Sequence, residues 1–410
     1  MNYLKLATHD YLGAGLASVK RVEALRNRGI NAKLIVFEKR STNEHVVGLL
    51  DRNKKVDTFL LKVLRVLRTW YKGNRIKEIN PRYYYYNIEL NIISARKILK
   101  MYGAKPDIID VSWVTDFISA RTVNKLQRLT GAKIVYVMTD NAPITGGCHY
   151  PWACKGFTAT CYPCPALQPG SHLAEKTLAK RKRYIKPDMI ITGTTSDCNR
   201  ARVSTLFKEA IIVPSAQVRP NPYRFPKEAG RKRWAIDAHR YVVFCGASFI
   251  NEERKGFHLL IEAINLMNQR GDDLSTVTFL VAGSEQLVFP PNLDVRMVGK
   301  LDEEALFMAY DCSDLFVSPS LEDSGPMMMN YAFKAYLPVV CFPTGISLDL
   351  IEHKTNGYVA AWGDAADYAA GLLFCMEHRQ TIEAHIHEVN DRIEQYIKQH
   401  CSIDTYLGLE

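Results

Sequence analysis

Short apolar runs alternate with stretches of helical periodicity in both halves of the chain. In the first half the strand-like runs are Lys33–Phe37, Ile108–Val111, Lys133–Met138 and Met189–Thr192. In the second half they are Tyr241–Cys245, Thr278–Ala282, Leu315–Ser318 and Pro338–Phe342. Helical periodicity is clearest at Leu16–Arg28, Phe257–Asn268 and Glu303–Tyr310. This alternation is typical of βαβ units, and it predicts two doubly wound, Rossmann-like α/β lobes.

A proline-rich stretch separates the two sets of runs. Pro214, Pro220 and Pro222 fall within nine residues and interrupt any regular element. We therefore expect one domain over residues 1–215, a second over residues 216–380, and a polar helical segment over residues 381–410. Open parallel sheets bind ligands at the carboxyl ends of their strands, so we expect both domains to face a central cleft that holds the ligand.

Composition places the chain among globular proteins. Its 410 residues are 47% hydrophobic and 23% charged, which suits two or three domains with a large core and excludes a disordered or collagenous chain. The N-terminus shows no secretory signal, and no apolar run of about 18 residues occurs, so we expect a cytoplasmic protein without a membrane span. In the reducing cytoplasm, its ten cysteines are expected to be thiols or metal ligands rather than disulfides.

The net charge of +10 makes an anionic partner plausible, and much of it is local. Residues 51–82 hold ten basic and three acidic side chains. Within them Lys62, Arg65, Arg68 and Lys72 recur at helical spacing beside an apolar side that contains Phe59, Leu60, Val63, Leu64, Leu67 and Trp70. One interpretation is a basic amphipathic helix that lies on anionic lipid; the other is a core-packed helix with a solvated basic face. A second basic cluster, Lys180–Arg183, is interpreted as a solvated helix end.

Two segments are candidates for binding a phosphate. The glycine turn Leu12–Leu16 opens a helix, so backbone N–H groups there can face an anion, although a turn that needs small residues explains it equally well. Gly246–Ser248 leaves a predicted strand, and Arg254–Phe257 follows at the head of a helix. Two cations beside a helix N-terminus can neutralise a leaving diphosphate.

The run Pro319–Pro326 leaves a strand and enters an apolar helix. In this run the sequence resembles family 4 of the retaining glycosyltransferases, which have the GT-B fold. Further matches follow in the family's order: Arg254–Phe257, Val281–Gly283, Val298–Gly299, Pro338–Val340 and His353–Tyr358. The first half resembles a subgroup with a cysteine-rich loop, over residues 145–165, through Gly13–Gly15, Thr139–Asp140, Thr145–Tyr150 and Cys161–Cys164. The resemblance spans roughly residues 1–375.

The resemblance implies roles for individual residues. Lys255 would hold the donor diphosphate, Asp323 would contact the transferred sugar, and Asp140 would complete the catalytic set. The donor, a UDP- or GDP-sugar, would be bound through Gly13, Ala14, Gly15, Ser248, Arg254, Glu322, Ser324, Gly325, Pro326, Tyr331 and Gly345. Transfer with retention in this family proceeds on one face of the sugar, without a side-chain nucleophile and with no catalytic metal expected. The protein contributes charge stabilisation and positioning.

Three positions depart from the family pattern. Tyr331 stands where the family has the glutamate that binds the donor ribose, Thr139 replaces its histidine, and Ser248 replaces its first diphosphate cation. A phenol offers one oxygen where a carboxylate offers two. The alternative to an active enzyme is therefore a catalytically silent relative that binds a nucleotide sugar or serves as a scaffold.

Four cysteines share one loop. Cys148, Cys154, Cys161 and Cys164 have the spacing C-x5-C-x6-C-x2-C, and four thiolates can close a tetrahedral shell around structural zinc. Unligated thiols and disulfides stay open as alternatives. His149 can replace one cysteine as a ligand or face the acceptor.

Together the resemblance and the basic helix imply a retaining glycosyltransferase that moves a sugar from a nucleotide sugar to a lipid-linked saccharide acceptor. The expected setting is cell-surface polysaccharide biosynthesis, with peripheral attachment to the inner face of the membrane. A zinc-containing nucleic-acid-binding protein is a weaker alternative, because no nucleic-acid module is recognisable.

Overall fold

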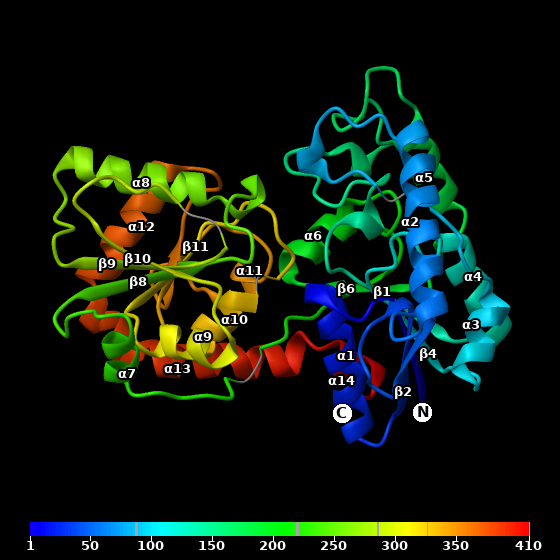
Figure 1. Cartoon of the computed structure of the whole chain (residues 1–410), viewed down its shortest axis with the longest axis horizontal. Helices are drawn as coiled ribbons and strands as arrows, with labels where there is room; N and C mark the ends of the chain where they lie inside the picture. The colour runs from blue at the N-terminus through cyan, green and yellow to red at the C-terminus, as the bar shows by residue number, and fades with distance from the viewer. Residues whose placement is uncertain (87–88, 219–220, 285–286, 326, 410) are drawn as a thin grey trace. The chain divides into compact units, whose positions relative to one another are not determined.

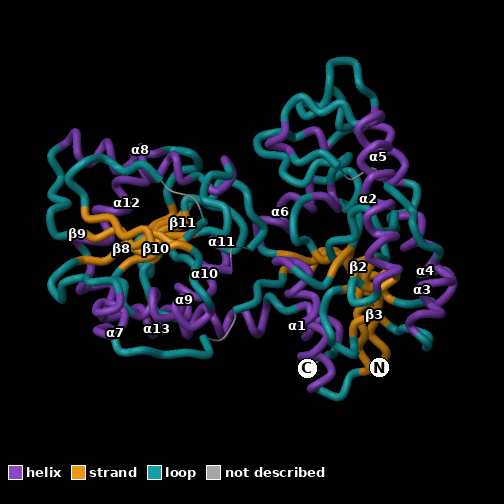
Figure 2. Tube along the Cα trace, in the orientation of Figure 1, coloured by secondary structure: helices purple, strands orange, loops and turns teal. Residues whose placement is uncertain are grey.

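The computed structural model describes residues 1–409 except 87–88, 219–220, 285–286 and 326 (Figure 1). Contacts divide the chain into two compact units. The first comprises Met1–Gly193, Asp197–Ser215 and Ser402–Glu410, and the second comprises Thr194–Ser196 and Ala216–Cys401. In each unit a central sheet is flanked by helices (Figure 2).

The sheet of the first unit is entirely parallel in its described pairings and has the order β3-β2-β1-β4-β5-β6-β7. Its strands are β1 (Asn2–His9), β2 (Asn31–Lys39), β3 (Val46–Asp51), β4 (Ile108–Val111), β5 (Lys133–Val137), β6 (Ile190–Gly193) and β7 (Ile211–Pro214). Leu34, Val36 and Val135 belong to its buried core. Its helices are α1 (Leu12–Asn27), α2 (Lys55–Arg75), α3 (Ala95–Tyr102), α4 (Ala120–Thr130), α5 (Leu173–Lys182), α6 (Thr195–Val203, whose first residues group with the second unit) and α14 (Ile403–Leu407).

The sheet of the second unit is also parallel, in the order β10-β9-β8-β11-β12-β13. Its strands are β8 (Tyr241–Gly246), β9 (Val277–Ala282), β10 (Asp294–Gly299), β11 (Leu315–Ser318), β12 (Val339–Cys341) and β13 (Gly357–Val359). Phe244, Phe316 and Val339 are buried in one apolar cluster. The helices are α7 (Lys227–Arg233), α8 (Phe257–Arg270), α9 (Glu303–Asp311), α10 (Met327–Lys334), α11 (Ser347–Leu350), α12 (Ala365–Glu377) and α13 (Arg379–His400).

The predicted fold class is therefore confirmed: both units are doubly wound α/β structures. In each sheet the strand order runs outward in both directions from the first strand of the unit, β1 or β8, as in a dinucleotide-binding fold. The sequence-predicted runs all correspond to strands, and the three helices with the clearest predicted periodicity correspond to α1, α8 and α9. Strands β1, β3, β7, β10 and β13 were not predicted.

The C-terminal segment is divided between the two units. Helix α13 packs on the second unit, where Ile393 and Ile397 join the apolar core and Lys334 donates to Glu394 at 2.7 Å. Helix α14 returns to the first unit, where the Asp404 carboxylate pairs with Arg21 and Arg28. Residues 381–410 are thus not one independent segment, because their apolar positions are buried in different cores.

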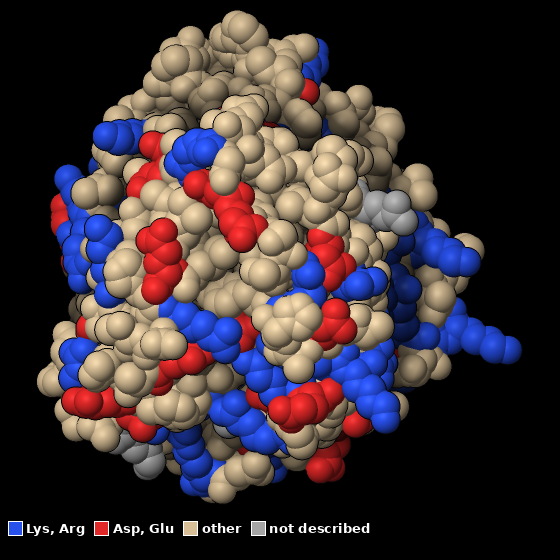
Figure 3. Space-filling view, turned by 90° about the vertical axis from the view of Figure 1, so that its left-hand side faces the viewer, with Lys and Arg blue, Asp and Glu red and all other residues tan. Residues whose placement is uncertain are grey.

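Charge is mixed on the side of the second unit that Figure 3 presents. Lysine and arginine side chains there are interspersed with aspartate and glutamate, and no broad single-sign field appears on this face. A nucleic-acid-binding surface would gather cations along one face. Among the described helices, none combines the length and hydropathy that a membrane span requires.

Candidate active site

The two most specific motifs of the second half lie at the carboxyl edge of the second sheet. Arg254 and Lys255 end a short 3-10 turn (Glu253–Lys255) that follows β8, and Asp323 lies in the loop that follows β11. Strands β8 and β11 are direct neighbours in the sheet. Because parallel strands end at the same edge, the fold brings these three side chains together.

The cations surround the Asp323 carboxylate. Lys255 Nζ donates to Asp323 Oδ2 at 2.5 Å, and Arg254 Nη1 lies 3.5 Å from the same oxygen. The Gly325 amide donates to the other oxygen, Oδ1, at 3.2 Å. Arg254 also pairs with Glu252 at 2.6 Å. The side chains of Lys255 and Asp323 keep 18% and 15% exposure, so this cluster is reachable by a ligand.

Two opposing effects set the pKa of Asp323. Burial raises it, but the charges of Lys255 and Arg254, with hydrogen bonds from Lys255 and the Gly325 amide, outweigh burial and hold the pKa below its usual value. Asp323 is therefore a carboxylate throughout the neutral range. The cluster offers two cations, one anion and a backbone amide, which suits a ligand that carries both phosphate and hydroxyl groups.

Gly256 allows the turn that carries Arg254 and Lys255 to pack closely against the loop that carries Asp323. It has a φ of +68°, and a Cβ built on it would lie 1.8 Å from the Pro319 carbonyl oxygen. Only glycine permits this contact. Next to it, the Leu321 amide donates to the Arg254 carbonyl at 2.8 Å, so backbone bonds hold the cationic turn against the start of the Asp323 loop.

Gly345 likewise permits a close backbone contact, here with the loop that carries Asp323. Its φ is +57°, and a Cβ there would lie 2.8 Å from the Asp323 carbonyl oxygen and 3.0 Å from the Ser324 carbonyl carbon. Trp362 Nε1 donates to the Leu321 carbonyl at 3.1 Å. The loop that carries Asp323 is thus held by backbone and side-chain contacts from two neighbouring segments.

The remaining predicted donor residues of this unit lie in varied surroundings. Ser248 is exposed, and its carbonyl accepts from Ser284 Oγ at 2.9 Å. Glu322 and Ser324 are buried, with 1% and 6% exposure. Pro326 lies outside the described residues. The Tyr331 ring is 7% exposed and packs in the aromatic core, with its centroid 4.8 Å from that of Phe307.

In the first unit, Asp140 occupies the corresponding edge. It follows β5, while Trp113 follows the adjacent strand β4. Asp140 Oδ2 accepts from Trp113 Nε1 at 2.8 Å and lies 2.7 Å from His149 Nδ1, and Oδ1 accepts from the Ala142 amide at 2.8 Å. A carboxylate accepts only, so Nδ1 of His149 carries the proton. Through these hydrogen bonds Asp140 can hold Trp113 and His149 in fixed orientations.

His149 is enclosed by other side chains. It is 1% exposed, its ring stacks on Tyr86 with centroids 4.4 Å apart, and Trp113 lies 5.8 Å away. Its Nε2 lies 3.5 Å from Thr115 Oγ1. The imidazole therefore has a fixed orientation, and its place on the acceptor side stays a prediction.

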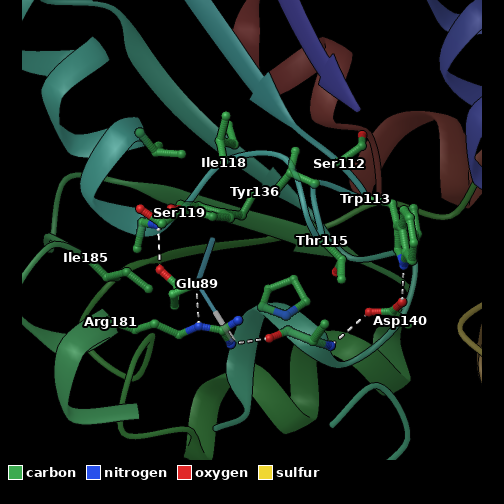
Figure 4. Close-up of a pocket in the computed structure, with 16 residues that line it drawn as sticks. Glu89, Ser112, Trp113, Thr115, Ile118, Ser119, Tyr136, Asp140, Arg181 and Ile185 are labelled. Atoms are coloured by element: carbon green, nitrogen blue, oxygen red, sulfur yellow. Dashed lines mark hydrogen bonds and ion pairs between the residues drawn. The ribbon is translucent and has the colours of Figure 1, made fainter. Parts of the chain in front are cut away.

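A cavity of about 40 Å³ lies beside Asp140 (Figure 4). By volume it can hold about three water molecules. The Tyr136 hydroxyl, in its lining, is buried without a hydrogen-bond partner among the described residues. On the far wall the buried Arg181 donates to Glu89 at 2.8 Å and also to the carbonyl of Thr145 at 2.6 Å. Arg181 is thus internal, which corrects the interpretation of Lys180–Arg183 as a fully solvated cluster.

The glycine turn of the first unit packs against a residue that the sequence did not single out. A Cβ on Gly15 would lie 2.8 Å from His9 Nδ1, whereas a Cβ on Gly13 would meet nothing within 4 Å. Ala14 lies between them at the start of α1. His9 ends β1, and burial lowers the pKa of its imidazole. Its ring lies between Tyr11 and Trp113, with centroids 4.5 and 5.2 Å away.

This difference predicts opposite effects for two alanine substitutions. We expect Gly15→Ala to destabilise the protein by about 2 kcal/mol, because the backbone of His9 must move. Gly13→Ala should be neutral or stabilising by up to about 1 kcal/mol, because alanine favours the helix. Thermal unfolding of both variants tests this, and equal melting temperatures would contradict it.

The predicted zinc site is not supported. Cys148, Cys154, Cys161 and Cys164 do line one small cavity. However, among the described residues no group of three or more His, Cys, Asp or Glu side chains is arranged to hold a metal ion. The four cysteines are free, and burial raises the pKa of Cys161 to about 11 and that of Cys148 further. The arrangement of these four side chains therefore does not support the predicted tetrahedral zinc shell.

His9, Trp113, Thr115 and Tyr86 are the residues of the first unit's cluster that the sequence did not reveal. The positions of two of them, His9 and Trp113, could have indicated a binding site. His9 closes the first strand and Trp113 follows β4 by two residues, so both stand where a parallel sheet binds ligands. Tyr86 reaches the cluster only through tertiary folding.

Sequence comparison identifies the second unit. Residues 239–378 match the family described as Glycosyl transferases group 1. The chain is also similar to the amylovoran biosynthesis glycosyltransferase AmsK of Erwinia amylovora, with 27% identity over 162 residues. That alignment covers 37% of this chain and 40% of the relative, so it spans well under two thirds of the relative's length.

Structural comparison extends over both units. A UDP-forming α,α-trehalose-phosphate synthase from Burkholderia xenovorans aligns with a TM-score of 0.60 and 13% identity, covering 100% of this chain and 98% of the other. Anabaena HepE, solved in complex with UDP-glucose, aligns with a TM-score of 0.58 and 14% identity, covering 99% and 96%. At 13% and 14% sequence identity, these similarities show a shared fold only. The chain thus has a GT-B fold, and residues 239–378 form a domain of the Glycosyl transferases group 1 type.

Proposed function

We propose that the chain is a glycosyltransferase, of EC class 2.4, that moves a sugar from a nucleotide-sugar donor to a saccharide acceptor with retention of configuration. The observation that carries this proposal is the grouping of Lys255, Arg254 and Asp323 at the carboxyl edge of the second sheet. The family match over residues 239–378, which include all three side chains, supports it.

The donor binds the second unit through charge and backbone contacts. Lys255 and Arg254 hold the diphosphate, because two cations on one turn neutralise the two charges of the leaving nucleotide. Asp323 then exchanges its bond with Lys255 for hydroxyl groups of the sugar. Gly325 and Gly345 allow close approach of the backbone, and Ser248, Glu322 and Ser324 complete the donor site. The proposed donor is a UDP- or GDP-sugar, and HepE, a fold relative, was solved with UDP-glucose.

The reaction is a substitution at the anomeric carbon. The bond from this carbon to the phosphate oxygen breaks, and a bond to the acceptor oxygen forms on the same face of the sugar. The proton of the acceptor hydroxyl passes to the leaving phosphate, so no side chain of the chain becomes covalently bound. Lys255 and Arg254 stabilise the negative charge that develops on the diphosphate, and Asp323 orients the sugar.

The first unit supplies the acceptor side. Asp140 fixes the orientation of His149 and Trp113, and this rigid group, with the Gly13–Gly15 turn, positions the acceptor or the donor phosphate. The acceptor is a saccharide on a lipid carrier, met at the cytoplasmic face of a membrane during synthesis of a cell-surface polysaccharide. The partial similarity to an amylovoran biosynthesis glycosyltransferase supports this setting.

A donor screen tests the proposal. The purified chain is mixed separately with UDP-glucose, UDP-galactose, GDP-mannose, ADP-glucose, UDP and GDP, and thermal unfolding and nucleotide release are measured. We expect at least one nucleotide sugar to raise the melting temperature and to be slowly hydrolysed or transferred, since a ligand of the folded state stabilises it. For a transferred sugar, the anomeric coupling of the product tests retention. No stabilisation by any nucleotide sugar, UDP or GDP would contradict the proposal.

One observation favours a catalytically silent relative instead. At the position where related enzymes have a ribose-binding glutamate, the Tyr331 ring is buried against Phe307 and Tyr310. In that case a nucleotide sugar would stabilise the protein without being consumed. Turnover that is lost in Asp323→Ala would exclude this alternative.

A further inference from the structure

Helix α2 presents an apolar stripe to solvent. Val56, Phe59, Val66 and Trp70 are 71%, 66%, 68% and 69% exposed, and Leu60, Val63 and Leu67 between them are exposed as well. These positions follow the spacing of three and four residues that defines one face of a helix. Figure 1 shows α2 as a long helix on the outside of the first unit. Single exposed apolar residues are ordinary, but a continuous stripe over about four turns indicates a partner.

The opposite face of α2 attaches the helix to the first unit, largely through charge. Lys72 donates to Asp116 at 2.7 Å, and the Arg68 guanidinium lies 3.8 Å from the same carboxylate. Arg68 also lies over the Phe37 ring, 4.5 Å from its centroid, and Leu61 is buried. Two of the four cations that define the basic face in the sequence thus point inward. The interpretation as a core-packed helix with a solvated basic face is therefore wrong: the solvent-facing side is mostly apolar.

Two of the cations that remain on the surface, Lys55 and Lys62, border this stripe, whereas Arg65 lies on the opposite side of the helix. Lys55, Lys62 and Arg65 are exposed, and Arg75 is exposed at the end of the helix. At about 100° per residue, Lys55 and Lys62 lie next to the stripe on one side. Asp57 is the one acidic residue of α2. An apolar face bordered by cations complements a surface that is apolar inside and anionic outside.

We propose that α2 docks on an anionic lipid bilayer, with the stripe in the acyl boundary and Lys55 and Lys62 at the lipid phosphates. A second copy of the chain fits less well, because pairing two such stripes brings like charges together. This inference deepens the proposed membrane location by naming the surface and its lipid chemistry. Because it concerns docking alone, it can hold whether or not the chain transfers sugar.

Vesicle flotation tests the docking without any sugar donor. The full chain is mixed with vesicles of phosphatidylcholine containing 30 mol% phosphatidylglycerol, or of phosphatidylcholine alone. We expect binding to the anionic vesicles, weakened at least tenfold by the triple change Phe59→Ser, Val66→Ser and Trp70→Ser. These side chains are exposed, so the variant should keep the wild-type melting temperature. The matched control is Leu129→Ser with Val203→Ser, two exposed apolar residues of the first unit outside α2.

A second variant separates charge from hydrophobic insertion. Lys55→Glu combined with Lys62→Glu should abolish the preference for anionic vesicles, and high salt should weaken wild-type binding. Insertion should also shift the Trp70 fluorescence to shorter wavelength, a change absent in Trp70→Phe. The proposal is overturned if the wild type does not float with anionic vesicles or if the serine variant binds as well as the control. A dimer that the serine substitutions dissociate, without vesicle binding, would likewise overturn it in favour of self-association.

Discussion

Replacing Asp323 with asparagine should lower kcat/KM for sugar transfer by about 100-fold, the size of effect seen when one preorganised electrostatic contact is removed. Asparagine has nearly the same shape but loses the charge that holds Lys255 at 2.5 Å and Arg254 at 3.5 Å. Lys255 and Arg254 then lose the carboxylate that both of them contact, and the sugar loses a charged hydrogen-bond acceptor. The measurement is a comparison of initial rates with the donor that stabilises the wild type most.

The pKa of Asp323 gives this prediction a dependence on pH. Although burial raises that pKa, Lys255 and Arg254 hold it below the usual aspartate value, so its ion pair stabilises the fold fully above about pH 4. That stability is lost as the pH falls through the depressed pKa, and Asp323→Asn should lack this acid-dependent loss. Asp237→Asn, at an exposed residue before β8 and hence at the other edge of the sheet, is the control. Equal activity of the two variants would contradict the assignment.

Gly256→Ala should destabilise the second unit by about 3 kcal/mol, adding a left-handed backbone penalty to a steric clash. The clash is the larger part, because a Cβ would lie 1.8 Å from the Pro319 carbonyl oxygen. Relief of the clash requires the turn that carries Arg254 and Lys255 to move away from the Asp323 loop. Donor binding should therefore fail together with stability. Urea unfolding followed by fluorescence and a donor titration measure the two effects.

Gly271→Ala separates the two contributions. Gly271 ends the same helix, α8, with a φ of +79°, but a Cβ there would meet nothing within 4 Å. We expect it to cost about 1 kcal/mol from the backbone alone and to leave donor binding unchanged. If Gly256→Ala costs no more than Gly271→Ala, the loop packing described for the second unit is wrong.

The sequence predicted strands from short, mostly apolar runs, because burial on both faces leaves such runs in parallel sheets. It missed β1, where Lys5 interrupts the apolar pattern. The structure buries Lys5 to 4% exposure and pairs it with Asp110 at 2.7 Å. Strand β10 was missed for a different reason: it lies at the sheet edge, is only half-buried, and carries Asp294 and Arg296. Neither property follows from local periodicity.

The donor side of the candidate site was accessible from sequence because its residues follow two strands within short loops. The first unit was less accessible. Asp140 and His149 were identified, but the indole and imidazole that complete their cluster, Trp113 and His9, have no motif of their own. For α2 the periodicity revealed an amphipathic helix but not its orientation, because Asp116, which draws Arg68 and Lys72 inward, comes from a distant loop.

Calorimetric titration of the full chain with UDP and with GDP tests the central claim, which is a diphosphate site built on Lys255. The wild type should bind one equivalent of at least one of them. Lys255→Ala should weaken that binding at least tenfold, while Lys354→Ala, at an exposed lysine in the loop before β13, should leave it unchanged. Binding by Lys255→Ala with wild-type affinity, or no binding of either nucleotide by the wild type, would contradict the claim.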